Sequence, residues 1–396
     1  MPLIRLPFIA LTVLAAALAG VAAPVAAATE KHPKAAAVLA RDKAKAKASA
    51  KKKPVAKQAA KAPARRAPVV ADNAPDSEAV NFREWSAVQQ FEEEMVAKHG
   101  FKRAELDTLF SQARLLETAV NLVKPAPPGK PKNWQAYSSR FIEPIRINAG
   151  VRFWNENAET LARAERIYGV PAEILVGIIG VETVYGRDTG KFRVIDTLTT
   201  LAFAYPEAPN RPQRMAFFRG ELENTLLLAQ HEGVDPFSLL GSYAGAVGLP
   251  QFMPGSILKW GVDFDNDGHV NLRNSVADAI GSVANFLVVH GWKRDHTGPT
   301  AYAAQVAPSM AWEPMLDKGL VATFRPDELS AAGVTTAAVL PPEPLYGLVD
   351  LQNGAEATEY WVVSDNFFAI TNYNRSYFYA MSVVDLGRAV RLTRGI

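Results

Sequence analysis

Glu182 is an acidic residue near the end of one of the most apolar stretches of the chain, Pro171–Gly186. Leu175 and Ile178 precede it by two turns and one turn of the expected helix, so the three side chains share a face. Apolar surroundings raise the pKa of a carboxyl, and the negative end of the helix dipole acts in the same direction. A carboxylic acid that stays protonated near pH 7 is what general-acid cleavage of a glycosidic bond requires. The alternative is a solvated glutamate in the last helical turn, and the local pattern favours neither.

The segment Gly241–Ser256 is dense in glycine and other small residues, with Gln251 as a polar member. This composition suits close approach of the backbone to a ligand. The alternative is a glycine-rich turn packed under a helix. A nucleotide-binding loop is excluded because the flanking strand of a βαβ unit is missing.

A third motif resembles a cation-binding loop. Asp263, Asp265 and Asp267 alternate, Gly268 follows, and His269 would offer its backbone carbonyl at the seventh position. Three close carboxylates repel one another unless a cation neutralises them. The twelfth position holds asparagine instead of the usual bidentate acid. The motif predicts a structural calcium or sodium ion, and the alternative is a turn without metal.

These residues need a scaffold, and the apolar spacing predicts a mainly α (α+β) one. Helices are predicted at Phe82–His99, Arg103–Leu116, Ala158–Tyr168, from Pro171 onward, Phe217–His231, Val276–His290 and Ser376–Val390. A small antiparallel β region at about 345–371 is predicted from three short strands and a tight Asn353-Gly354 turn. The strands are expected at Leu345–Leu351, Tyr360–Ser364 and Phe367–Thr371.

The first 79 residues differ in composition from the rest. Residues 1–28 carry Arg5, then an apolar stretch and small residues, which predicts a signal peptide and an exported, periplasmic protein. A buried amino-terminal helix is the alternative. Residues 29–79 are rich in Lys, Ala and Pro and are predicted to be a disordered linker. We expect a tether, with the anionic wall or membrane surface as the alternative partner of its positive charge.

Composition excludes several classes of function. The 396 residues include no cysteine, which excludes disulfides, thiolate metal sites and a lipid-modified cysteine. Residues 30–70 hold 13 Lys and Arg against two acidic residues, which leaves residues 71–396 with a net charge of about −9. The compact part is therefore not expected to bind nucleic acid.

The motifs around Glu182, Gly241–Ser256, Asp263–Leu272 and Ala279–Asn285 occur in one order that resembles the lytic murein transglycosylase B family. The resemblance covers residues 80–396 and implies a lysozyme-like catalytic core with an additional helical region. It implies cleavage of the MurNAc–GlcNAc β-1,4 bond of peptidoglycan with formation of 1,6-anhydro-MurNAc ends. Glu182 would be general acid and then base, without a cofactor. The family closes a longer cation loop with a later aspartate, which makes Asp278 the closing ligand of a loop at 263–278.

The resemblance also implies a set of substrate-binding residues. They are Ser242, Gln251, Phe252, Met253, Tyr373, Asn374, Tyr379 and Arg214. Glu207–Gln213 looks like an insertion, which puts Arg214 in doubt, and Phe217 and Phe286 stand where the family has tyrosines. The absent lipid-attachment cysteine separates this chain from the membrane-anchored members and implies a soluble form, which we expect to be a monomer.

Two alternatives to the transglycosylase stay open at this point. One is a muramidase of the same fold, in which water attacks. The other is a non-catalytic protein that binds peptidoglycan as a scaffold. Zinc-hydrolase and serine-hydrolase functions are excluded because the chain has neither an HExxH nor a GxSxG motif.

Overall fold

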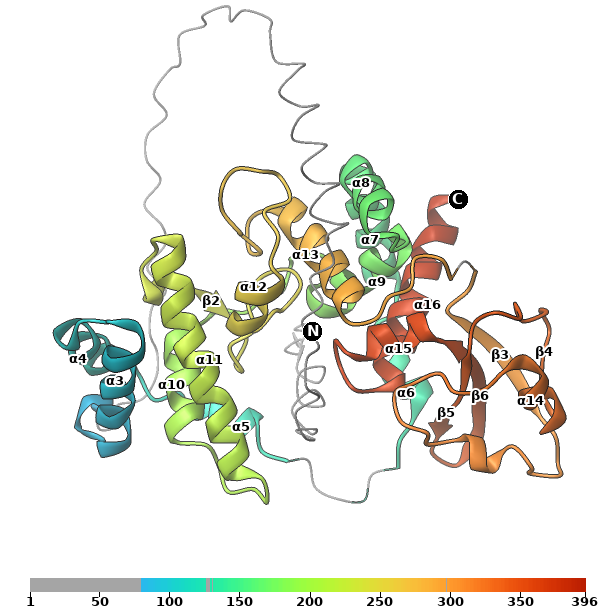
Figure 1. The fold of residues 1–396 in the computed structure, drawn as a ribbon, viewed down its shortest axis with the longest axis horizontal. Coiled ribbons are helices and arrows are strands. Elements are labelled where there is room, and N and C mark those ends of the chain that lie inside the picture. Colours follow the sequence, from blue (N-terminus) through green and yellow to red (C-terminus); the bar gives the residue numbers. More distant parts are fainter. Residues whose placement is uncertain (1–79, 126–128, 130, 297) are drawn as a thin grey trace, which may run out of the picture.

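A computed structural model describes residues 80–125, 129, 131–296 and 298–396. The predicted signal peptide and linker lie outside the described residues. The described chain is mainly helical, as predicted (Figure 1). Its α-helices are α3 (Ser86–His99), α4 (Arg103–Gln112), α5 (Glu117–Leu122), α6 (Trp134–Ser138), α7 (Pro144–Glu156), α8 (Ala158–Tyr168), α9 (Ala172–Thr183), α10 (Val194–Phe203), α11 (Arg211–Glu232), α12 (Pro254–Trp260), α13 (Val276–Val289), α14 (Pro326–Ala331), α15 (Asp365–Thr371) and α16 (Tyr377–Arg394). Within the described ranges, no helix is both long and apolar enough to cross a membrane.

The strands form two small sheets. A two-stranded sheet joins β1 (Phe192–Arg193) to β2 (Leu240–Gly241). The larger antiparallel sheet has the order β4-β3-β6-β5. Figure 1 shows α10, α11 and α12 on one side of the molecule and the larger sheet with α14 on the other, with α9, α13 and α16 between them. The strands of the larger sheet are β3 (Ala301–Val306), β4 (Val334–Thr336), β5 (Tyr346–Asn353) and β6 (Glu356–Ser364).

The predicted hairpin is correct, but the third predicted strand is wrong. Asn353 pairs with Glu356 across a turn in which Gly354 has a φ of 66°. Phe367–Thr371 belongs to helix α15, and all its residues are buried. A fully apolar run of this length lacks the alternation that distinguishes a strand from a buried helical turn. Strands β3 and β4 were not predicted.

The helix predicted at Arg103–Leu116 ends at Gln112 because the chain after it bonds to α10. The amide of Arg114 donates to Asp196 Oδ1 at 3.1 Å, and that of Leu116 donates to Thr200 Oγ1 at 3.0 Å. These side-chain acceptors replace helical carbonyls. The helix predicted at Phe217–His231 begins earlier, at Arg211, so the last three residues of the apparent insertion are helical.

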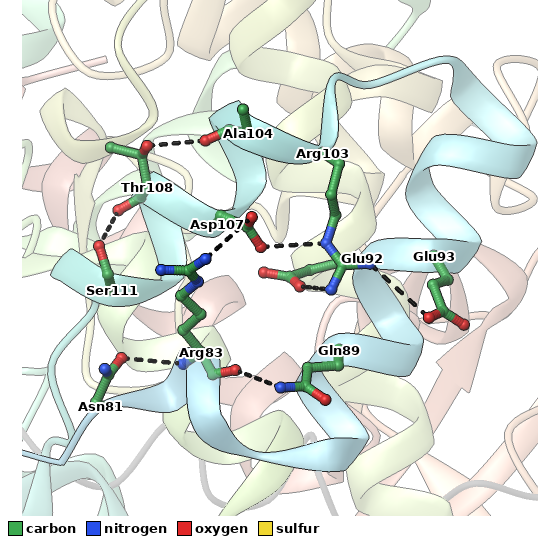
Figure 2. A network of polar contacts seen from close by, with 10 residues as sticks. All are labelled: Asn81, Arg83, Gln89, Glu92, Glu93, Arg103, Ala104, Asp107, Thr108 and Ser111. Atoms are coloured by element: carbon green, nitrogen blue, oxygen red, sulfur yellow. Dashed lines mark hydrogen bonds and ion pairs between the residues drawn. The ribbon is translucent and has the colours of Figure 1, made fainter.

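An ion pair with a buried carboxylate holds the first two helices together (Figure 2). Glu92 of α3 is fully buried, and its Oε2 lies 2.9 Å from Nη2 of Arg103 on α4. Arg103 also donates to Asp107 at 3.1 Å, and Asp107 in turn pairs with Arg83 at 3.4 Å. The network fixes α4 against α3 and the short turn before it.

The contact between α9 and α16 places the catalytic candidate. A Cβ on Gly177 would lie 2.3 Å from the carbonyl oxygen of Val383, and one on Gly387 would lie 2.2 Å from that of Glu173. Each helix therefore needs a glycine where it meets the backbone of the other. This close packing brings the start of α16 to the end of α9.

Candidate active site

In the second half of α9, Glu182 is partly exposed and every other residue is buried. Tyr379, in the first turn of α16, donates its hydroxyl to Glu182 Oε1 at 2.6 Å. The Tyr379 side chain is fully buried, and its ring stacks with that of Tyr373 at a centroid distance of 6.2 Å. The two tyrosines converge because Ser376 caps a new helix between them, which is the helix start that their spacing requires.

Burial raises the pKa of Glu182 from 4.5 to about 7. The hydrogen bond from Tyr379 and the positive charge of Arg146 both lower this pKa, but less than burial raises it. The phenol of Tyr137 also faces Glu182, and burial raises the pKa of Tyr137 to about 12. Glu182 thus exchanges its proton near neutral pH, while the surrounding phenols remain protonated donors.

The backbone after Glu182 adopts an unusual turn. Val184, Tyr185 and Gly186 have φ angles of 51°, 60° and 85°, a left-handed run that a β-branched residue rarely adopts. Thr183 stabilises this turn because its hydroxyl accepts from the amide of Gly186 at 3.0 Å and donates to the carbonyl of Leu249 at 2.8 Å. The second bond ties the end of α9 to the glycine-rich segment.

The glycine-rich segment lies against this turn. Gln251 has a φ of 51°, and its side-chain amide donates to the carbonyls of Gly248 at 2.8 Å and Thr189 at 3.3 Å. Two bonds from one nitrogen fix the orientation of the Gln251 amide. The Ser242 hydroxyl accepts from the amide of Ala246 at 3.1 Å and so shapes the turn.

An aromatic wall continues from Tyr373. The Tyr373 hydroxyl donates to the carbonyl of Pro250 at 2.6 Å, and its ring lies 5.8 Å from Phe252 and 4.9 Å from Phe286. Phe252 is 3% exposed, so its ring supports the site from beneath. Met253 caps α12 and packs against the core.

The predicted cation loop lies between α12 and α13. Ligand atoms of Asp263, Asp265 and Asp278 lie within 4.8 Å of one another, which fits a single hard cation. Asp267 is outside this group and accepts from the amide of His269 at 2.9 Å. The His269 ring contacts Glu232 of α11 at 3.0 Å. Three of the five predicted residues therefore offer converging side-chain oxygens.

Comparisons with known proteins identify the family of the chain. The family described as "Transglycosylase SLT domain" matches residues 81–388. The membrane-bound lytic murein transglycosylase B of Escherichia coli K12 is 44% identical over 315 residues, which are 77% of this chain and 83% of that protein. The chain belongs to the lytic murein transglycosylase B family.

Two solved structures extend the comparison. The E. coli lytic transglycosylase Slt35, in complex with calcium, is 42% identical with a TM-score of 0.70 and covers 79% of this chain and 95% of its own. SltB3 of Pseudomonas aeruginosa, in complex with NAG-anhNAM-pentapeptide, is 26% identical with a TM-score of 0.66. The match covers 77% of this chain and 78% of SltB3. The predicted lysozyme-like fold and the family resemblance are thus confirmed.

The residues predicted from the family are not equally close to Glu182. Tyr379 contacts it, Tyr373 stacks on Tyr379, and the Gln251 segment is tied to the end of α9. Asn374 directly follows Tyr373 in the chain, and its side chain is buried. Arg214 is 5% exposed on α11 and faces the phenol of Tyr205.

Sequence reasoning missed Tyr137 of α6 and Arg146 of α7. The charge of Arg146 lowers the pKa of Glu182, and the phenol of Tyr137 faces the Glu182 carboxyl. Tyr137 lies in a five-residue helix, and its ring packs on the rings of Phe378 and Phe141. Neither residue lies in a motif, and the aromatic pattern of Trp134–Phe141 was the available signal.

Proposed function

We propose that this lytic murein transglycosylase cleaves the MurNAc–GlcNAc β-1,4 bond of peptidoglycan, with Glu182 as general acid and then base. The observation that carries the proposal is a carboxyl that opens to solvent at the end of a buried helix and accepts the hydroxyl of Tyr379 at 2.6 Å, with its pKa raised to about 7 by burial. The groups that face it among the described residues are three phenols and a guanidinium. A mechanism with one carboxyl therefore fits better than one with a carboxylate pair.

The proposed reaction needs no water. Protonated Glu182 donates its proton to the glycosidic oxygen, and the bond from this oxygen to C1 of MurNAc breaks, which leaves a hydroxyl on GlcNAc. The N-acetyl oxygen of the substrate stabilises C1. The Glu182 carboxylate then takes the proton of the C6 hydroxyl as that oxygen bonds to C1. The products are a GlcNAc hydroxyl end and a 1,6-anhydro-MurNAc end, and Glu182 is protonated again.

The substrate would be held by the residues around this acid. Ser242, Gln251, Phe252, Met253, Tyr373, Asn374 and Tyr379 are our candidates because they lie on the segments that meet at Glu182. Arg214 stays a prediction for the carboxylates of the lactyl-peptide. We also propose that the chain is exported to the periplasm and works as a monomer, with the basic linker as a tether.

Mass spectrometry of the soluble products from purified peptidoglycan tests the proposed reaction. We expect muropeptides that are lighter by one water than the hydrolytic ones, because the ring closes without water. Products with reducing ends would indicate the muramidase instead. A protein that sediments with peptidoglycan but releases no products would be the non-catalytic binder.

We propose that the loop at 263–278 holds calcium as a structural ion. The converging oxygens of Asp263, Asp265 and Asp278 support this, and the related Slt35 was solved with calcium. Ligands that bind only the folded state stabilise it, by about 2.7 kcal/mol at a hundredfold excess over Kd.

Chelation should therefore lower the melting temperature of the wild type, and added calcium should restore it. The Asp263→Asn variant is the matched control, and its melting temperature should respond much less. An identical wild-type melt in chelator and in excess calcium would refute the site.

A further inference from the structure

The guanidinium of Arg146 fastens the helical turn that carries Glu182. Arg146 lies in the first turn of α7, where the Glu143 side chain accepts from its amide at 2.7 Å. Its Nη1 donates to the carbonyl oxygens of Gly180 at 2.9 Å and Val181 at 3.1 Å. Carbonyls in the last turn of a helix lack regular amide donors, so a side-chain donor there replaces them.

The Val181 carbonyl needs such a donor because α9 ends abruptly. The left-handed turn at Val184–Gly186 leads the chain away from the helix axis. The amide of Val184 reaches Gly180 at 3.2 Å, and that of Tyr185 reaches Ile179 at 3.4 Å. The Val181 carbonyl, directly before Glu182, is bound by Arg146.

The positive charge of Arg146 is poorly neutralised. Its side chain is 13% exposed, and its buried Nε has no hydrogen-bond partner among the described residues. A carboxylate oxygen of Glu143 lies 3.9 Å from this Nε, which is an ion pair without a hydrogen bond. Tyr185 and Asp188 also face Arg146. Its charge therefore acts on Glu182. In the part of the chain that the structure describes, the other groups facing Glu182 are the phenols of Tyr137, Tyr373 and Tyr379.

Resting on the function proposed above, we propose that Arg146 is a positioning residue that holds the last turn of α9 and lets Glu182 both release and regain its proton. Burial and the helix dipole favour the protonated carboxyl, and Arg146 opposes both. An acid–base catalyst works best when its pKa lies near the operating pH. Without Arg146 the carboxyl would stay protonated to higher pH and would be a weaker acid.

The pH dependence of kcat for the full protein tests this role. Activity is lost as the pH rises through the pKa of Glu182 because the acid must be protonated. Arg146→Gln removes a nearby positive charge, so this alkaline limb should move upward by about one pH unit. At the wild-type optimum, kcat should fall about tenfold. Arg146→Lys keeps the charge but loses the planar fork, so its limb should stay in place while kcat falls.

Arg152, an exposed residue on the same helix, provides the matched control. Arg152→Gln should leave both the limb and kcat unchanged. The proposal would be overturned if the alkaline limb of Arg146→Gln did not move. It would also be overturned if the limb of Arg146→Lys moved upward by about one pH unit, the shift expected for Arg146→Gln. Either result would leave the role of Glu182 intact as long as Glu182→Gln is inactive and the wild type releases anhydro products. An active Glu182→Gln variant would instead reject the proposed function itself.

Discussion

Glu182→Gln should reduce the release of anhydro-muropeptides by about 10³-fold or more, because it removes the acid and the base in one change. Glutamine retains the size of the side chain and can still accept the Tyr379 hydroxyl bond, so the site should keep its geometry. The measurement is the initial rate of product release from purified peptidoglycan, at several values of pH. Wild-type activity in this variant would reject the assignment of Glu182.

Stability provides the control, and its sign can be stated. Burial raises the pKa of Glu182 from 4.5 to about 7, so between these values the folded protein holds a proton that the unfolded chain has released. The free energy of unfolding of the wild type therefore falls as the pH rises through this window, by up to about 3 kcal/mol. Glu182→Gln should be the more stable protein at pH 8 and should match the wild type below pH 4.5. An inactive variant that is also less stable at pH 8 would indicate misfolding.

The catalytic candidate could be predicted because its signal is local. A carboxylate at the end of an apolar helix stands out in one stretch of sequence, and the structure places Glu182 among buried neighbours that raise its pKa, as that pattern implied. Tyr373 and Tyr379 needed the family resemblance, since their approach to Glu182 depends on the packing of α16 against α9. Arg146 carried no signal at all, because its partners are backbone carbonyls, which any sequence supplies.

The fold shows the same division. Helix α8 has the predicted bounds because Gly169 ends the helix in a left-handed conformation, a stop signal that is visible in the sequence. Strands β3 and β4 escaped prediction because each pairs with a partner distant in the sequence and has one weakly apolar face. Non-local pairing of this kind leaves little trace in local periodicity.

Asp278→Ala should be among the most destabilising single changes in the chain, with a loss of about 3–5 kcal/mol of unfolding free energy. Asp278 is fully buried, and its carboxylate accepts from the amides of Phe264 at 2.7 Å, Asn271 at 2.8 Å and Asp265 at 3.3 Å. Alanine would leave these donors without an acceptor in a place that water does not reach. Urea denaturation followed by circular dichroism measures the change.

Two other variants separate the contribution of these backbone hydrogen bonds to stability from the contribution of a bound cation. Asp267→Ala removes an exposed carboxylate of the same loop that bonds one amide, so its cost should stay below about 1 kcal/mol. Asp278→Asn keeps one acceptor oxygen, but its NH₂ group must face a backbone N–H, so its cost should be intermediate. The same order should hold in chelator, because the three bonds to Asp278 form within the protein and do not depend on an ion. If chelator removed the difference between Asp278→Ala and Asp267→Ala, Asp278 would act mainly through the cation, and its backbone bonds would contribute little.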